Sequence, residues 1–245
     1  MTAAAILAGG LGMRLRPTVR DRPKVLAPVA GRPFLSYLLD QLAGAGAQRV
    51  VLCTGYLGEQ VRAALGDRYG ALELSYSEES TGMGTAGALR LALPVLDTDP
   101  VLVLNGDSYC GADLNDFASW HQACGSGGAG SLVLTWVEDA SRFGTVDVDG
   151  CGIVLSFREK TGLAIPGWIN AGVYLLSRRL VTSIPVGSAV SIERDVFPAW
   201  VGRGLRAYRA RAPFLDIGTP DSYAEAESFF ANCNASSLRR LEGGG

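Results

Sequence analysis

Short apolar runs alternate along the first half of the chain with segments whose apolar residues recur at helical spacing. Unbroken runs predict buried strands over residues 3–7, 49–54 and 101–104, because a strand covered on both faces has no polar positions to alternate. The apolar positions within residues 34–42 mark one face of a helix. The same patterns predict a strand over 72–76 and helices over 58–65, 86–93 and 114–123. This alternation predicts an α/β fold, with a mostly parallel sheet and helices on both faces.

The second half of the chain follows a different pattern, in which strands succeed one another with only turns between them. These strands are expected over residues 131–137, 144–148, 153–158, 168–176 and 205–209. Ser191 is a good N-cap for a helix that continues to residue 201, and Pro220 opens another helix. We therefore expect a more antiparallel wall added to the parallel sheet. The length favours one domain over residues 1–232, followed by a flexible tail over 233–245.

The first apolar run leads directly into a glycine-rich loop. Three glycines fall within residues 9–12, and they are followed by Arg14 and, further on, by Lys24. Glycines let backbone N–H groups approach an anion closely, and cationic side chains complete such a site. A dinucleotide fingerprint would need glycine where Leu15 stands, and a P-loop would need Gly-Lys-Ser/Thr. The loop therefore predicts a phosphate site of another kind, with an ordinary strand-to-helix turn as the alternative.

Three further features belong to the same expected edge of the sheet. Residues 78–87 form a second glycine-rich loop, which is either a flexible connector or a ligand loop. Asp107 follows the strand over 101–104, where a carboxylate is either part of an Asn-Gly-Asp turn or a ligand for a divalent cation near phosphates. Asp216 is a second acid in an apolar setting, and the two could converge on one metal.

Composition narrows the class of protein. The net charge of −2 and the lack of a Lys/Arg block argue against nucleic-acid and membrane-surface partners. Five scattered cysteines without a C-x-x-C pair, and the lack of a leader-like N-terminus, predict a reduced, cytoplasmic compartment. The single histidine, His121, lies in an expected helix and is given no chemical role.

The chain resembles the sugar-1-phosphate nucleotidyltransferases over about residues 3–230. The resemblance rests first on the signature L-A-G-G-x-G-x-R-L, present from Leu7 to Leu15, and on Pro23-Lys24. Later landmarks follow in the family's order, at Asp107, Phe143-Gly144, Glu159-Lys160, Asn170 to Tyr174 and Asp216 to Thr219. Within the superfamily the chain is most similar to the D-glycero-D-manno-heptose 1-phosphate guanylyltransferases. Mannose, glucose and muramyl members share much of the same frame.

This resemblance implies a Rossmann-like three-layer fold and a set of site residues. It implies catalytic roles for Arg14, Lys24 and Asp107, and a Mg²⁺ cofactor held by Asp107 and Asp216. The nucleotide, carried by the part over about 1–125, would be lined by Leu7, Ala8, Gly9, Gly10, Gly12, Arg14, Gly82, Gly84 and Thr85. The sugar phosphate, carried by the part over about 126–232, would contact Gly144, Glu159, Lys160 and Asn170. Met13 departs from the family, since most members have threonine there.

The implied reaction joins an NTP, with GTP favoured, to a sugar 1-phosphate and releases pyrophosphate. A sugar phosphate is already an anion, so positioning and charge neutralisation replace a strong general base. Alternative substrates are mannose 1-phosphate with GTP, or glucose and amino-sugar 1-phosphates with thymidylyl or uridylyl donors. A non-catalytic nucleotide-sugar-binding protein, a nicotinamide-dependent oxidoreductase and a glycosyltransferase are the alternatives of other classes. The resemblance also allows a homo-oligomer.

Overall fold

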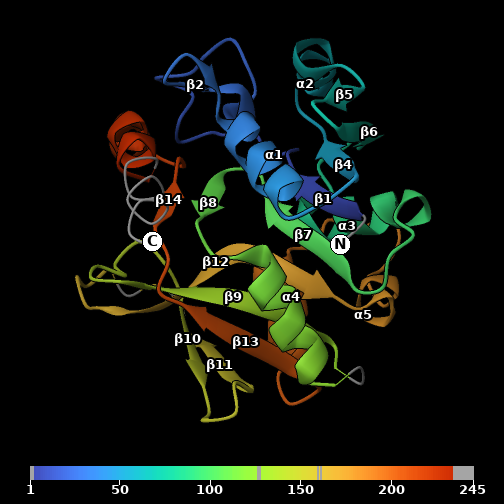
Figure 1. The fold of residues 1–245 in the computed structure, drawn as a ribbon, viewed down its shortest axis with the longest axis vertical. Helices are drawn as coiled ribbons and strands as arrows, with labels where there is room; N and C mark the ends of the chain where they lie inside the picture. The colour runs from blue at the N-terminus through green and yellow to red at the C-terminus, as the bar shows by residue number, and fades with distance from the viewer. Residues whose placement is uncertain (1–2, 126–127, 159, 161, 234–245) are drawn as a thin grey trace, which may run out of the picture.

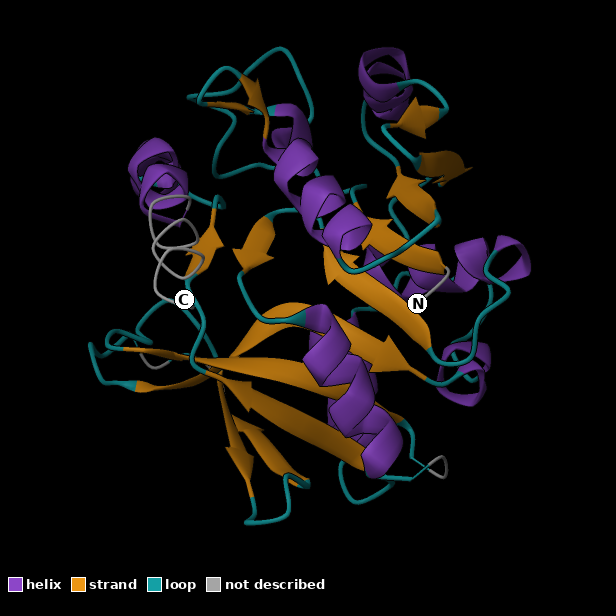
Figure 2. Ribbon diagram, in the orientation of Figure 1, coloured by secondary structure: helices purple, strands orange, loops and turns teal. Residues whose placement is uncertain are grey.

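Helices and strands alternate through the first half of the chain, and strands dominate the second half (Figures 1 and 2). The structure is a computed structural model that describes residues 3–125, 128–158, 160 and 162–233. Its strands are β1 (Ala3–Leu7), β2 (Pro28–Val29), β3 (Arg32–Pro33), β4 (Arg49–Thr54), β5 (Arg68–Tyr69), β6 (Leu72–Glu78), β7 (Val101–Asn105), β8 (Ser108–Cys110), β9 (Gly130–Val137), β10 (Thr145–Val148), β11 (Val154–Arg158), β12 (Gly167–Leu176), β13 (Leu205–Ala210) and β14 (Phe214–Asp216). Its helices are α1 (Phe34–Gly44), α2 (Gly58–Leu65), α3 (Gly84–Ala92), α4 (Leu114–Ala123), α5 (Arg178–Thr182), α6 (Phe197–Trp200) and α7 (Pro220–Ala224), with short turns η1 (Lys24–Leu26), η2 (Leu93–Val95) and η3 (Ile192–Val196).

The parallel part of the sheet has the strand order β7-β1-β4-β6. From β1 the chain moves outward on one side to β4 and β6, and it then returns to β7 on the other side of β1. The loops that leave the carboxyl ends of β1 and β7 therefore diverge. Such a switch point is where open α/β sheets bind ligands.

The antiparallel strands continue the same sheet instead of forming a separate layer. Strand β12 pairs antiparallel with β7, from Val173 opposite Leu104 to Leu176 opposite Val101. The same strand also pairs with β9 and β10, while β13 runs parallel to β9. Figure 2 shows these long strands fanning out below the parallel part. The two halves of the chain thus share one hydrogen-bonded sheet.

Helices cover both faces of the sheet, which confirms the predicted three-layer α/β/α fold. Helices α1 and α4 lie over the face turned to the viewer in Figure 1, and α1 buries Phe34, Leu38 and Leu42 as its spacing predicts. A second hydrophobic cluster on the other face includes Leu89 of α3 and Leu180 of α5. None of the helices within the described residues is long and apolar enough to cross a membrane.

The expected helix over residues 191–201 is wrong as a single α-helix. Ser191 caps it as predicted, since its Oγ accepts the N–H of Arg194 at 3.2 Å. However, Val196 N–H bonds to the carbonyl of Ser191 at 3.1 Å, five residues back, which makes η3 a turn of π-helix before the short α6. Pro198 has no N–H to continue the regular ladder. Single π turns of this kind are frequent at functional sites.

Candidate active site

The glycines of the first loop have three different surroundings. A Cβ on Gly9 would lie 2.8 Å from a carboxylate oxygen of Glu79 and 3.3 Å from the backbone nitrogen of Gly55, so a larger residue would displace the Glu79 side chain. Gly12 has a φ of +59° and lies against the Lys24 side chain. Gly10 has no other atom within 4 Å of its Cβ position, which leaves its backbone open to a ligand. Sequence alone treats these three positions as equivalent, but their surroundings differ.

Lys24 is held at the switch point by an ion pair with Asp107. The residue begins η1, and its Nζ donates to Asp107 Oδ2 at 2.5 Å. The Lys24 side chain is only 11% exposed, against 37% for Asp107, so the ammonium group is largely withdrawn from water. An ion pair shielded in this way is screened less by salt than a surface pair. The lysine is therefore positioned before any substrate binds.

Two short strands bring Asp216 beside Asp107. Strand β8 begins directly after Asp107 and pairs with β14, with Ser108 opposite Asp216, and Ile217 N–H donates to the carbonyl of Asp107 at 3.0 Å. Gly106 lets this turn approach β1, because a Cβ there would lie 2.6 Å from the carbonyl oxygen of Leu7. The convergence of the two acids that the sequence left open is thus built by backbone pairing.

The surroundings of Asp216 suit a bound cation. Burial raises the pKa of Asp216, and the nearby charge of Asp107 raises it further, although Lys24, the Gly218 N–H and Arg142 act in the opposite direction. Arg142 Nη2 lies 3.5 Å from Asp216 Oδ1. The described residues contain no group of three or more His, Cys, Asp or Glu side chains placed to hold a metal. Two neighbouring carboxylates are nevertheless a donor set that fits Mg²⁺, which usually takes one or two carboxylates plus substrate oxygens.

Two cavities meet at these carboxylates. The first, of about 420 Å³, lies over the glycine loops, and the second, of about 470 Å³, lies over the antiparallel strands. Asn105, Asp107 and Glu193 line both cavities. Two ligands that occupied both cavities would therefore meet beside Asp107.

Most of the residues expected in the site line one of these cavities. Those in the first cavity are Leu7, Ala8, Gly9, Gly10, Lys24, Gly82, Gly84, Thr85 and Asp107. Those in the second are Arg14, Asp107, Gly144, Asn170 and Asp216. Gly12 lines neither cavity and borders a small adjoining hollow instead. Lys160 is exposed and also lines neither cavity, and Glu159 lies outside the described residues.

The second glycine loop is shaped by the segment that precedes η3. A Cβ on Gly84 would lie 2.5 Å from the carbonyl oxygen of Val190, and one on Gly87 would lie 2.6 Å from that of Ser188. Gly84 also has a φ of +67°. The Thr85 hydroxyl is engaged within the protein, since it donates to Glu193 and accepts the Ile192 N–H. These contacts place the end of this loop in the cavity wall, which favours the ligand-loop alternative.

Sequence reasoning assigned no role to Glu79 and Glu193, both of which line the first cavity. Glu79 Oε2 accepts the Met83 N–H at 2.8 Å, and burial raises the pKa of this carboxyl group. Glu193 lies in the first turn after the Ser191 cap, where an acid is ordinarily explained by the helix dipole. Only its position between the two cavities distinguishes it from such an acid.

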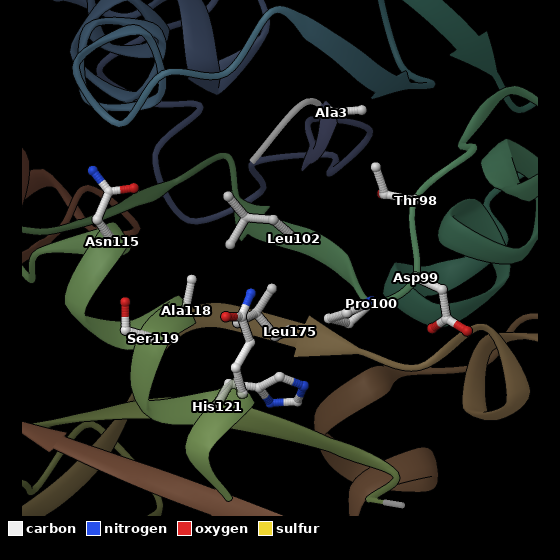
Figure 3. Close-up of a pocket in the computed structure, with 11 residues that line it drawn as sticks. Ala3, Thr98, Asp99, Pro100, Leu102, Asn115, Ala118, Ser119, His121 and Leu175 are labelled. Carbon is white, nitrogen blue, oxygen red and sulfur yellow. The ribbon is translucent and has the colours of Figure 1, made fainter. Parts of the chain in front are cut away.

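A further cavity, of about 440 Å³, lies at the opposite edge of the sheet, where β1 and β7 begin (Figure 3). Ala3, Leu102 and Leu175 form its apolar side, and polar residues of α4, including His121, form the other. His121 Nδ1 lies 2.8 Å from Ser131 Oγ, and burial lowers the pKa of the imidazole. The histidine is thus a half-buried, hydrogen-bonded side chain remote from Asp107.

The two cavities lie at the carboxyl ends of parallel strands, beside a switch point in strand order, which is where open α/β sheets bind ligands. The chain belongs to the Nucleotidyl transferase family, whose model matches residues 3–232.

Similar proteins agree with this assignment. The mannose-1-phosphate guanylyltransferase of Mycobacterium tuberculosis is 36% identical over 92% of this chain and 63% of its own length. The D-glycero-alpha-D-manno-heptose 1-phosphate guanylyltransferase of Aneurinibacillus thermoaerophilus is 33% identical over 91% of this chain and 96% of its own length. The crystal structure of HddC from Yersinia pseudotuberculosis complexed with GMP-PN has a TM-score of 0.82 and 31% identity, and the match covers 94% of this chain and 100% of that one. The chain thus spans less than two thirds of the mycobacterial protein.

Proposed function

We propose that this protein is an enzyme that joins GTP to a sugar 1-phosphate, D-glycero-alpha-D-manno-heptose 1-phosphate, with release of pyrophosphate. The observation that carries this proposal is the Lys24–Asp107 pair at the meeting point of two cavities, with Asp216 beside it. A phosphoryl-transfer site needs cations and in-line positioning more than it needs a base. The site supplies the cations, and its two cavities supply the positioning.

In the proposed reaction, an oxygen of the sugar phosphate attacks the α-phosphorus of the nucleotide. The new P–O bond forms as the bond from the α-phosphorus to the oxygen between the α- and β-phosphates breaks, so pyrophosphate leaves with that oxygen and the electron pair. Lys24 would neutralise charge on the α-phosphate, and Arg14, beside Asp216 in the second cavity, would neutralise charge on the phosphates. Asp107 and Asp216 would hold Mg²⁺, which supplies further charge neutralisation. Gly144 and Asn170, which line the second cavity, would face the sugar phosphate.

We call the first cavity the nucleotide cavity and the second the sugar cavity, after the substrates that we propose for them. A carboxylate in the nucleotide cavity supports the preference for GTP. Glu79 Oε1 lies against the backbone of Gly9 and Gly55, while Oε2 is held by the Met83 N–H. An ionised carboxylate only accepts hydrogen bonds. Guanine presents two adjacent donors, N1–H and N2–H₂, whereas the single N3–H of uracil or thymine is flanked by carbonyl oxygens that a carboxylate repels. Glu79 therefore suits a guanine better than a pyrimidine.

Two heptose enzymes among the relatives, from Aneurinibacillus thermoaerophilus at 33% identity and from Campylobacter jejuni at 32%, support the heptose as the sugar. The mannose enzyme from Mycobacterium tuberculosis is slightly more identical, at 36% against 33%, which makes mannose 1-phosphate the second candidate. We also propose a cytoplasmic location, where buried thiols such as those of Cys53 and Cys110 stay reduced.

The experiment is a matrix of four NTPs against heptose, mannose, glucose and amino-sugar 1-phosphates, scored by pyrophosphate release. We expect the highest kcat/KM with GTP and the heptose 1-phosphate. Activity with GTP and mannose 1-phosphate but not with the heptose would replace the sugar and leave the chemistry intact. No pyrophosphate release with any pair would overturn the proposed activity and favour a protein that only binds nucleotide sugars.

A further inference from the structure

Glu193 has four hydrogen-bond donors, which come from four separate parts of the chain. Its Oε1 accepts from Asn105 Nδ2 at 3.3 Å and from the Tyr174 hydroxyl at 3.1 Å. Its Oε2 accepts from the hydroxyls of Thr85 and Ser191, each at 3.1 Å. A carboxylate offers about four acceptor positions, so these donors fill its capacity. The π turn η3 presents this side chain at the wall shared by the two cavities.

The donors on Oε2 belong to the nucleotide side. Thr85 is the second residue of α3 and follows the glycine loop of the first cavity. Its hydroxyl also accepts the Ile192 N–H at 2.8 Å, and the carbonyl of Val190 accepts the Ala86 N–H at 2.9 Å. The start of α3 is thus fastened to the segment that carries Glu193.

The two donors on Oε1 are Asn105, which precedes the turn that carries Asp107, and Tyr174, which lies on β12 on the side of the sugar cavity. Asn105 ends β7, two residues before Asp107. Tyr174 lies on β12, and its hydroxyl accepts from Asn170 Nδ2 at 2.9 Å. Asn170 Oδ1 in turn accepts the Gly172 N–H at 3.0 Å and fixes the irregular part of β12, where the register with β9 shifts. Through Tyr174, Glu193 therefore reaches the wall of the second cavity.

The chemistry of these contacts indicates that Glu193 holds its neighbours in place. All four donors are neutral hydroxyl or amide groups, so Glu193 forms no ion pair with any of them. Tyr174 is fully buried, and burial together with Glu193 raises the pKa of its phenol well above the usual value, which keeps the phenol protonated and donating. Removal of the carboxylate would deprive the buried Tyr174 hydroxyl and the half-buried Thr85 hydroxyl, which lie on the two sides of the site, of this acceptor.

We propose that Glu193 is a positioning residue that sets the nucleotide cavity and the sugar cavity against each other through its neutral hydrogen bonds. This inference rests on the proposed function for its kinetic signature. Glutamine keeps the length of glutamate and one carbonyl acceptor, and the hydroxyls of Thr85 and Ser191 can turn to accept from its amide. Glutamine should therefore substitute for glutamate, and alanine should not.

The kinetic test compares Glu193→Ala and Glu193→Gln with Asp195→Asn, a matched control on the same turn. We expect Glu193→Ala to lower kcat/KM for both substrates by about 30-fold or more, and Glu193→Gln and the control to stay within about threefold of the wild type. Thr85→Val should raise KM mainly for GTP, and Tyr174→Phe mainly for the sugar 1-phosphate. Circular dichroism of each variant checks that it is folded.

A second readout does not depend on activity. Hydrogen exchange of the Ile192 and Gly172 amides reports the nucleotide side and the sugar side separately, because their acceptors are Thr85 Oγ1 and Asn170 Oδ1. Glu193→Ala should speed exchange at both amides by about tenfold, and Glu193→Gln and Asp195→Asn should not. If the wild type releases no pyrophosphate, the proposed function fails, and the exchange comparison alone decides the role of Glu193.

Two results would overturn this inference. Equal losses in Glu193→Gln and Glu193→Ala would mean that the negative charge itself acts on a substrate. Near-wild-type kinetics and exchange in Glu193→Ala would mean that the four hydrogen bonds position nothing.

Discussion

The two cavities are built in different ways. The nucleotide cavity is lined largely by two continuous stretches, one after β1 and one at the start of α3. The sugar cavity takes its lining from the ends of many elements, including β7, β10, β11, β12, η3 and β14. Residues that line a cavity from one loop form a motif that can be recognised in the sequence. Residues that come from many strands come together only when the sheet forms.

The largest expected effect is at the junction of the two cavities. Lys24→Met removes the ammonium group beside Asp107 but keeps most of the side chain, so we expect kcat to fall by about 100- to 1,000-fold, or about 3–4 kcal/mol of transition-state stabilisation. Arg22→Met is the control, since Arg22 is exposed and pairs with Asp21. Pyrophosphate release with saturating substrates measures both variants. Near-normal turnover in Lys24→Met would show that the junction is not the reacting centre.

The next effect tests whether the second glycine loop is shaped by packing. In Gly84→Ala the new Cβ would lie 2.5 Å from the carbonyl oxygen of Val190, at a φ of +67°. We expect the free energy of unfolding to fall by about 2–4 kcal/mol. Gly82→Ala is the matched control, because no other atom lies within 4 Å of its Cβ position. Urea denaturation measures both, and equal losses would contradict the packing explanation.

A smaller effect tests how the nucleotide cavity recognises the nucleobase. Glu79→Gln replaces one acceptor oxygen by a donor, so we expect the preference for GTP over UTP, measured as the ratio of kcat/KM values, to fall by about 10- to 100-fold. The mechanism in the sugar cavity should be unaffected, and KM for the sugar 1-phosphate should stay the same. An unchanged ratio would move base recognition to backbone groups.

The smallest effect concerns stability and pH in the absence of a divalent metal. The pKa of Asp216 is raised, so its carboxyl group binds a proton more tightly in the folded state than in the unfolded state. The ionised Asp216 therefore lowers the free energy of unfolding, and this loss is complete above the folded pKa. Asp216→Asn should therefore raise Tm by about one to three degrees near pH 7.5, and the difference should vanish near pH 3.

The matched variant for this measurement is Asp139→Asn. Hydrogen bonds from Ser141 lower the pKa of Asp139, so its stabilising contribution is present above the unfolded pKa and is lost as pH falls through the folded pKa. Asp139→Asn should lower Tm near neutral pH. Thermal melts at both pH values test the pair, and shifts of the same sign would contradict the assignment.

The sequence predicted the local parts of this molecule well. The strand over 49–54 and the helices over 58–65 and 114–123 match β4, α2 and α4 residue for residue. Their apolar spacing reflects burial against the sheet, which acts on each segment separately. The prediction of one α-helix over 191–201 failed because the π turn depends on a local hydrogen bond between residues five apart and on Pro198, and hydrophobic spacing records neither.

The candidate site was predictable where its residues are consecutive or belong to a family motif. Gly9, Gly10 and Lys24 were singled out from the residue pattern alone, and all three line the nucleotide cavity. Glu193 was not found, because three of its four partners lie on α3, β7 and β12, which the sequence does not place beside residue 193.

By itself, the sequence determined the α/β class, the alternation of strands and helices in the first half of the chain and the glycine-rich loop after β1. These features depend on hydrophobic period and on backbone freedom, both of which are local properties. Only the tertiary structure places Asp107 beside Asp216, packs Gly84 against the carbonyl group of Val190 and puts Glu193 between the two cavities. Each of these is a contact between distant segments, and only the pairing of β8 with β14 and the course of the chain through η3 bring those segments together.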